Sequence, residues 1–193
     1  MAPLSMHAAT LFSENFEGAT LGFGVTTAGQ FTTTGGTNVD VLGAGNGFGF
    51  ECLAPESGQC VDLGGTGGNQ LGNLVSTLIS IPSAGTYFLS FNLVGNSVTR
   101  LPTSATVNFG AYSQTFTLAF QDTVSGIVVN APVVFASAGS FALSFVNTTA
   151  GAGPDGPILD NVSVTGNTPE PASALLLGSA LFAASLIRKR AVR

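Results

Sequence analysis

Short runs in which apolar and polar residues alternate recur along residues 10–165, and this period of two restricts the fold more than any other feature. Successive residues of a β-strand face opposite sides of a sheet, so each run predicts a strand with one buried face. Gly, Asn, Ser and Pro bound the runs and predict turns. No stretch of this region has the period of an amphipathic helix. Eight or more strands at this spacing predict an all-β fold, an antiparallel β-sandwich.

Three of these runs identify residues expected in the core. Apolar residues occupy alternate positions in residues 85–93, around 116–120 and in 141–145. The side chains predicted to face the core are Tyr87, Leu89, Phe91, Leu93, Phe116, Leu118, Phe120, Phe141, Leu143 and Phe145. Pro132 interrupts another apolar run and cannot donate to a sheet, so an edge strand or two short strands are expected there. With 15 Phe and no Trp, the chain must fill its core largely with Phe.

Charge is scarce and unevenly distributed. Only 8% of the 193 residues are charged, so the surface must consist largely of Ser, Thr, Asn and Gly, as is typical of secreted β-proteins. Four of the five basic residues, Arg188, Lys189, Arg190 and Arg193, fall in the last six positions, and only Arg100 precedes them. Nucleic-acid binding requires several Lys or Arg to neutralise phosphates, so the acidic body of the chain excludes that function.

Two cysteines, Cys52 and Cys60, flank a short polar segment. A disulfide between them is predicted for an oxidising compartment. Two separate buried thiols are the alternative.

The C-terminal segment combines three features in a fixed order. Pro169, Glu170 and Pro171 precede the apolar run 172–187, and the basic end 188–193 follows. A helix of 16 residues is about 24 Å long against a hydrocarbon core of about 30 Å, so it spans a membrane only with local thinning or snorkelling. The positive-inside rule places the basic end in the cytoplasm and residues 1–168 outside. A helix packed on the domain is the alternative, but the run has no polar face.

This order resembles the PEP-CTERM sorting signal of exopolysaccharide-producing bacteria, which is also labelled an ice-binding protein C-terminal domain. The resemblance covers residues 168–193, although Thr168 stands where Val is commoner. It implies that an exosortase, a membrane-embedded cysteine transpeptidase, recognises the motif Pro169, Glu170 and Pro171 and the basic Arg188, Lys189 and Arg190 as substrate. It also implies an exported protein, first anchored in the inner membrane by helix 172–187 and then located at the cell surface or in the extracellular matrix.

The N-terminal residues 1–9 lack the basic region and the long apolar run of a complete signal peptide. They are similar only to its cleavage region, so we expect a true start upstream and a mature chain that begins near Ala9 or Thr10. The predicted organisation is therefore a leader remnant (1–9), a β-sandwich domain (10–165) and a sorting tail (166–193).

Four short segments of the central domain resemble β-jelly-roll domains related to carbohydrate-binding modules. They are residues 11–18, 60–63, 84–87 and 156–164. The resemblance implies a structural Ca²⁺ held by Glu17 in the first strand and Asp160 in the last, and Ca²⁺ does prefer hard oxygen ligands. Asp160 shares a face with Val162 and Val164 if the alternation is regular, which would bury its carboxylate. Alternatively, Glu17 is a solvated loop residue and Asp160 caps a turn at Asn161.

Catalytic residues are hard to find in this chain. General acid–base and nucleophilic mechanisms need reactive side chains held together, but His7 falls in the leader, Lys189 in the tail, and the cysteines are expected to be bonded. The sequence therefore predicts a non-catalytic surface or matrix protein, with an exopolysaccharide-binding module as the alternative.

Sugar binding commonly uses exposed aromatic side chains, which leaves Tyr112, Phe23, Phe48 and Phe50 as candidates. Ice binding would need a flat array of Thr, and residues 32–34 form the one short Thr cluster, with no repeat after it.

Overall fold

The computed structural model describes residues 7–43, 52, 58–67, 70–96, 100–150 and 155–168. By their internal contacts, Thr10–Thr165 form one compact unit. Every regular element among the described residues is a β-strand, and every described pair of strands is antiparallel. This confirms the all-β prediction. No helix in the described ranges has the length and hydrophobicity needed to cross a membrane. The predicted helix 172–187 lies outside the described residues.

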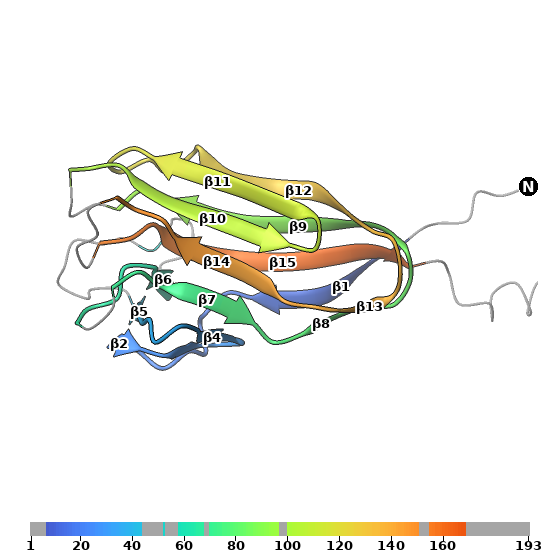
Figure 1. Ribbon diagram of the computed structural model, residues 1–193, viewed down its shortest axis with the longest axis horizontal. Coiled ribbons are helices and arrows are strands. Elements are labelled where there is room, and N and C mark those ends of the chain that lie inside the picture. Colours follow the sequence, from blue (N-terminus) through green and yellow to red (C-terminus); the bar gives the residue numbers. More distant parts are fainter. Residues whose placement is uncertain are drawn as a thin grey trace, which may run out of the picture. The chain divides into compact units, whose positions relative to one another are not determined.

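Two sheets stack face to face, as Figure 1 shows. The seven-stranded sheet has the order β12-β9-β15-β6-β5-β2, and β1 also pairs with β15. Its strands are β12 (Gly126–Phe135), β9 (Gly85–Val94), β15 (Ile158–Thr168), β6 (Cys60–Asp62), β5 (Val39–Leu42), β2 (Gly22–Val25) and β1 (His7–Glu14).

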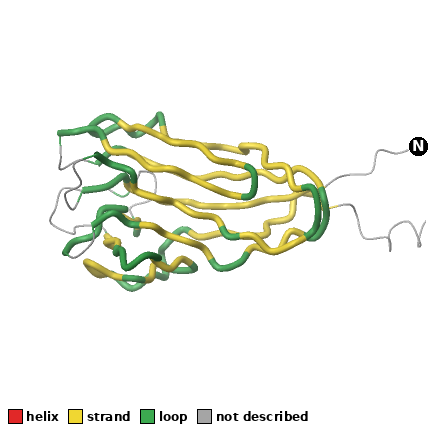
Figure 2. Tube along the Cα trace, in the orientation of Figure 1, coloured by secondary structure: helices red, strands yellow, loops and turns green. Residues whose placement is uncertain are grey.

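The six-stranded sheet has the order β11-β10-β14-β7-β4-β3. Its strands are β11 (Tyr112–Leu118), β10 (Thr103–Phe109), β14 (Leu143–Asn147), β7 (Asn73–Ser76), β4 (Phe31–Thr33) and β3 (Thr27–Ala28). A separate pair, β8 (Ile79–Ile81) and β13 (Gly139–Phe141), closes one end of the sandwich. Figure 2 shows that the described loops gather mainly at the two ends of the strands.

The alternation in the sequence matches the observed burial in the long strands. In β9 and β14 the predicted core side chains are buried, and the residues between them are half-buried. Phe116 and Leu118 are buried as well, whereas Phe120 follows the end of β11 and is 37% exposed. Phe141 is only partly buried because it belongs to the short β13. The prediction was therefore wrong for Phe120, where the strand had already ended.

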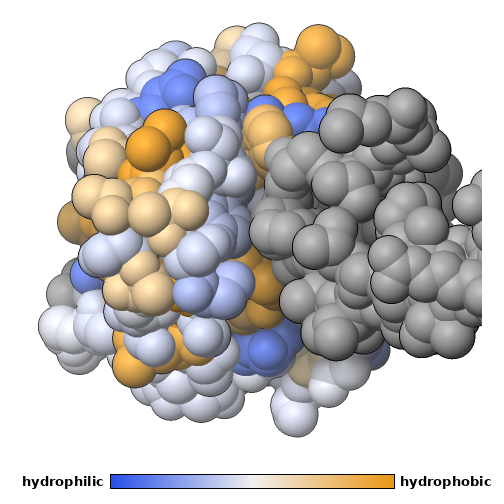
Figure 3. Space-filling model, turned by 90° about the vertical axis from the view of Figure 1, so that its right-hand side faces the viewer, coloured by the Kyte–Doolittle hydropathy of each residue, from blue (hydrophilic) through white to orange (hydrophobic). Residues whose placement is uncertain are grey.

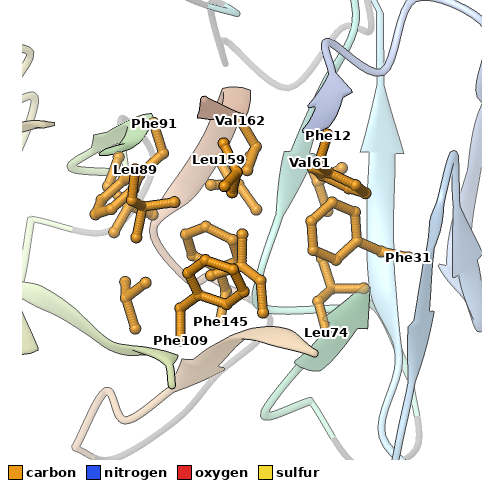
Figure 4. Packing of buried hydrophobic residues seen from close by; sticks show 14 of the residues in the cluster. Phe12, Phe31, Val61, Leu74, Leu89, Phe91, Phe109, Phe145, Leu159 and Val162 are labelled. Atoms are coloured by element: carbon orange, nitrogen blue, oxygen red, sulfur yellow. The ribbon is translucent and has the colours of Figure 1, made fainter. Parts of the chain in front are cut away.

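Phenylalanine side chains join the two sheets through a continuous series of ring contacts. Phe12 contacts Phe31 with ring centroids 5.6 Å apart, Phe31 contacts Phe145 at 5.9 Å, and Phe145 contacts Phe91 at 5.3 Å. The Phe91 ring then packs edge-on against that of Phe116 at 5.5 Å. Edge-to-face packing of this kind adds to the free energy of burial. Figure 4 shows the rings of Phe12, Phe31, Phe91 and Phe145 in the interior, which Leu159 and Val162 of β15 also fill.

Strand β12 forms one edge of the seven-stranded sheet, as the position of Pro132 within an apolar run predicted. It runs as a single strand, but its register with β9 shifts between Val128 and Ala131. Asn130 lies in this shift with a φ of 54°, in the left-handed region that Asn tolerates better than most residues. Pro132 then pairs opposite Phe88 at the sheet edge, where its missing N–H is tolerated.

The surface reflects the low charge content of the chain. Figure 3 views the molecule from the right-hand side of Figure 1, and most of the described surface there is pale, which indicates residues of intermediate hydropathy. Strongly hydrophilic residues occur only in scattered places, and apolar side chains form separate patches. Small uncharged side chains therefore cover much of this end of the molecule.

We expect Phe145→Ala to lower the free energy of unfolding by about 3–5 kcal/mol, because Phe145 is fully buried and links the Phe31 and Phe91 rings. Chemical denaturation of the purified protein measures this change. Val134→Ala is the control, since Val134 is 63% exposed on the edge strand and should change stability by no more than about 0.5 kcal/mol. Equal losses in both variants would contradict a core that depends on the aromatic series.

Candidate functional site

Cys52 and Cys60 form a disulfide, with their Cα atoms 5.4 Å apart, as the sequence predicted. Both pack with Leu42, Val94 and Ile158 in a small apolar cluster separate from the main core. Leu42 and Cys60 are cross-strand partners, and their neighbours along the strands belong to the main core. Since alternate residues face opposite sides, the disulfide covers the outer face of the seven-stranded sheet.

Glu17 lies in the turn after β1, not in the first strand, which ends at Glu14. Its carboxylate accepts a hydrogen bond from the backbone N–H of Gln59 at 2.8 Å. The Gln59 side chain lies against the carbonyls of Phe16 and Ala19, and its amide nitrogen can donate to both once the amide is turned toward them. Glu17 therefore links Gln59, next to the disulfide-bonded Cys60, to the turn that follows β1.

Asp160 is buried on β15, but it does not share a face with Val162 and Val164. Asn161 between them has a φ of 53°, and this left-handed residue shifts the alternation by one position. Leu159 and Val162 both face the main core, so Asp160 lies on the side of Ile158. Its carboxylate accepts a hydrogen bond from the N–H of Asn161 at 2.7 Å.

Calcium binding by Glu17 and Asp160 stays a prediction. The two carboxylates accept hydrogen bonds from separate parts of the chain, Gln59 and Asn161. Within the described ranges, no group of three or more His, Cys, Asp or Glu side chains could hold a metal ion. A Ca²⁺ there would need most of its oxygens from carbonyls and water.

Several residues singled out by the sequence lie outside the described residues. They are the sorting residues Pro169, Glu170, Pro171, Arg188, Lys189 and Arg190, and the aromatic candidates Phe48 and Phe50. Of the remaining aromatic candidates, Phe23 is half-exposed on β2, whereas Tyr112 on β11 is partly buried and its hydroxyl donates to Gln114. The two belong to different sheets and do not make one aromatic platform.

A buried polar cluster around Asp62 was not expected from the sequence. One carboxylate oxygen of Asp62 accepts hydrogen bonds from the N–H groups of Gly64 (2.7 Å) and Gly156 (2.8 Å), and the other accepts one from Asn96 Nδ2 (3.2 Å). Asn147 Nδ2 donates to the Leu63 carbonyl beside them. A Cβ on Gly64 would approach the Gly156 nitrogen to 2.3 Å, so only glycine allows this contact. Asp62 thus holds three loops together at one end of the sandwich.

Burial raises the pKa of Asp62 well above its ordinary value, although the N–H groups of Gly64 and Gly156 lower it. The nearby carboxylates of Asp40 and Asp155 raise this pKa further. Asp40 is itself bound to the N–H groups of Gly24 and Thr66 and to the Thr66 hydroxyl. These carboxylates act as structural acceptors within the fold, so they are poor candidates for acid–base catalysis.

A candidate binding surface is the outer side of the six-stranded sheet, which we call the uncharged face. It consists of the residues of these strands that alternate with the buried ones. They are Thr27, Thr32, Asn73, Val75, Ser104, Thr106, Asn108, Ser113, Thr115, Thr117, Ser144 and Val146. Every one except Val75 and Val146 carries a hydroxyl or an amide.

Polar side chains of the uncharged face bind one another across the strands. Ser113 Oγ donates to Asn108 Oδ1 at 2.8 Å, and Asn108 Nδ2 donates to Ser144 Oγ at 3.3 Å. The hydroxyls of Thr106 and Thr115 lie 2.8 Å apart. Cross-strand pairs of this kind fix the rotamers of the groups that a ligand would meet.

Among the described strands, charged side chains occur only in the other sheet. Across the six described strands behind the uncharged face there is no Asp, Glu, Lys, Arg or His. Glu14, Asp40, Asp62 and Asp160 all belong to strands of the seven-stranded sheet. The two outer faces therefore present different chemistry to a ligand.

No family model and no curated protein sequence match the chain. Among solved structures, the chain is similar to the K1 cleaved adhesin domain of Lys-gingipain from Porphyromonas gingivalis. The TM-score is 0.50 at 15% identity, over 83% of this chain and 99% of that domain.

Two carbohydrate-binding modules are also similar. A family 35 module from Paenibacillus barcinonensis has a TM-score of 0.46 at 15% identity, over 81% of this chain and 99% of that one. A module of lichenase 5A from Cellvibrio mixtus, in complex with cellotriose, has a TM-score of 0.44 at 13% identity, over 83% of this chain and 100% of that one. The likeness to the adhesin domain, at 15% identity, shows the fold alone.

We expect Asp62 to make the protein less stable as the pH rises above about 4, the unfolded pKa of an aspartate. The folded-state pKa is raised, so the folded protein binds more protons than the unfolded chain between the two values. The contribution is fully present below the unfolded pKa and is lost as the pH rises through the folded one. Thermal unfolding of the wild type and of Asp62→Asn across this pH range measures it, and the variant should lack this decline.

Asp122→Asn is the matched control, with the opposite sign. Hydrogen bonds from Ser125, through its side chain and its N–H, and from the N–H of Val124 lower the pKa of Asp122. Its stabilising contribution is present above the unfolded pKa and is lost as the pH falls. The prediction for Asp62 is wrong if Asp62→Asn leaves the decline with pH unchanged.

Proposed function

We propose that residues 10–165 form a non-catalytic carbohydrate-binding module, and that it binds a neutral polysaccharide through the uncharged face. The proposal depends on one observation: the outward residues of six adjacent strands carry hydroxyls and amides but no charge. Of the two interpretations left open by the sequence, a matrix protein without a ligand and a polysaccharide-binding module, this surface favours the second.

The chemistry of the uncharged face complements that of a neutral sugar. Sugar hydroxyls both donate and accept, as the Ser, Thr and Asn side chains of the face do. Val75 and Val146 lie near its centre on adjacent strands, in diagonal positions, and offer aliphatic contact to the C–H side of a sugar ring. Short side chains also lose little rotamer entropy on binding, and no charged group has to be desolvated.

Binding without cleavage fits the placement of the carboxylates. Hydrolysis of a glycosidic bond commonly needs a pair of carboxyl groups on either side of that bond. None of the strands behind the uncharged face contributes one. Asp40 and Asp62 accept hydrogen bonds from backbone N–H groups on the other sheet.

The proposed place of action rests mainly on the sequence. We propose that the tail 166–193 is sorted by an exosortase, and that the domain acts at the cell surface or in the extracellular matrix. The disulfide between Cys52 and Cys60 supports an oxidising compartment.

The purified protein should bind insoluble neutral glucans saturably and leave an acidic polymer such as alginate unbound. The probes are β-1,3-glucan, cellulose and alginate in a pull-down assay with increasing protein concentration. Because the face has no charge, affinity for the neutral glucan should change little with salt, unlike binding through exposed ion pairs. Binding to alginate that disappears in salt, without binding to either glucan, would contradict the proposal.

A variant pair assigns the binding to the face. Val146→Asp places a charge at the centre of the uncharged face and should lower the affinity for the neutral glucan by about tenfold, or about 1.4 kcal/mol. Val134→Asp is the matched control, because Val134 is exposed on the edge of the other sheet. If the control loses as much affinity as Val146→Asp, the uncharged face is not the binding surface.

A further inference from the structure

The strand registers align one complete row of outward side chains across the six-stranded sheet. The row runs through Ser113, Asn108, Ser144, Val75, Thr32 and Thr27, one residue from each strand. Strands lie about 4.8 Å apart, so this row is about 24 Å long. The next row, through Thr115, Thr106, Val146 and Asn73, covers four strands.

We infer that a neutral polysaccharide crosses the strands along this complete row, and that the face binds an internal stretch of the polymer instead of its end. The inference rests on the proposed function and adds the direction of the chain and the part of the polymer that is recognised.

The direction follows from the shape of the polar surface. Along the strands, the longest series of outward residues span from Ser104 to Asn108 in β10 and from Ser113 to Thr117 in β11, or about 14 Å each. At the other side, β4 and β3 are only three and two residues long. A chain laid across the strands therefore meets more polar groups than one laid along them.

The row also offers an ordered succession of contacts. At one end, Asn108 is held by hydrogen bonds to both Ser113 and Ser144, which fixes its amide across three strands. Val75 supplies an aliphatic side chain next to Ser144, and the hydroxyls of Thr32 and Thr27 follow. Hydroxyl-bearing positions thus lie on both sides of an apolar one, so that consecutive sugars can each find a partner.

Recognition of an internal stretch follows from the two ends of the row. Ser113 and Thr27 are exposed on β11 and β3, the terminal strands of the sheet. No strand of this sheet lies beyond either of them in the described structure, so the polymer can continue past both edges. Recognition of a chain end would need groups that enclose it, and no described strand of the sheet encloses this row at either end.

Calorimetry on the full-length protein tests the inference. The ligands are soluble β-1,3- and β-1,4-linked gluco-oligosaccharides, from the disaccharide to the octasaccharide. For the linkage type that binds, affinity should rise at least tenfold from the disaccharide to the octasaccharide, because each added sugar covers more of the row. Reduction of the terminal sugar to its alditol should change the affinity of the octasaccharide less than twofold. Affinity that is complete at the disaccharide, or that is lost on reduction, would overturn the inference while leaving carbohydrate binding intact.

Variants at the two ends of the row test its direction. Ser113→Glu and Thr27→Glu lie on opposite edges of the sheet, and each should weaken octasaccharide binding at least fivefold. Thr117→Glu, on the same strand as Ser113 but outside the row, should have a smaller effect than either. Val134→Glu on the other sheet is the control for added charge, and thermal unfolding checks that each variant is folded.

A loss in Thr117→Glu together with none in Thr27→Glu would place the polymer along β11 and overturn the cross-strand direction. If neither insoluble glucan nor any oligosaccharide binds, the proposed function fails and the inference fails with it.

Discussion

The fold depends on contacts between phenylalanine rings that bridge the two sheets. A chain without Trp and with few charges must gain its stability from apolar burial, and Phe provides the largest side chains for it. Phe91 from one sheet contacts Phe145 and Phe116 from the other, and Phe12 contacts Phe31 in the same way. These Phe side chains occupy alternate strand positions and point into the core. The residues between them point outward, so the two outer faces can bear polar side chains without disturbing the core.

The two sheets differ in the polar side chains that they contribute. One sheet holds the strand carboxylates, and the Cys52–Cys60 disulfide covers part of its outer face. The buried Asp62 of this sheet accepts hydrogen bonds from three loops. The other sheet presents only hydroxyls, amides and two valines. A low overall charge thus does not mean a uniform surface, because the carboxylates of the described strands all belong to one sheet and leave the face of the other neutral.

Much of the fold could be predicted from the sequence because strand alternation is a local signal. The core positions of β9 and β14, the edge position of β12 and the disulfide all followed from patterns within a few residues. Two features did not follow. The left-handed conformation of Asn161 places Asp160 on the face opposite to Val162, and the amino-acid sequence of that segment does not predict this change of face. The uncharged face depends on the pairing of six strands from residues 27 to 147, and register between distant strands is not written in either strand alone.

The irregular edge strand affects how densely copies of the molecule can be packed. Asn130 interrupts the even spacing of backbone groups in β12, and Pro132 removes one of its donors. An exposed strand with even spacing is a template on which a neighbouring molecule can add its own strand and start an aggregate. At this edge a neighbour finds no continuous set of partners, so copies crowded on a surface or in a gel can stay separate and keep their other faces accessible.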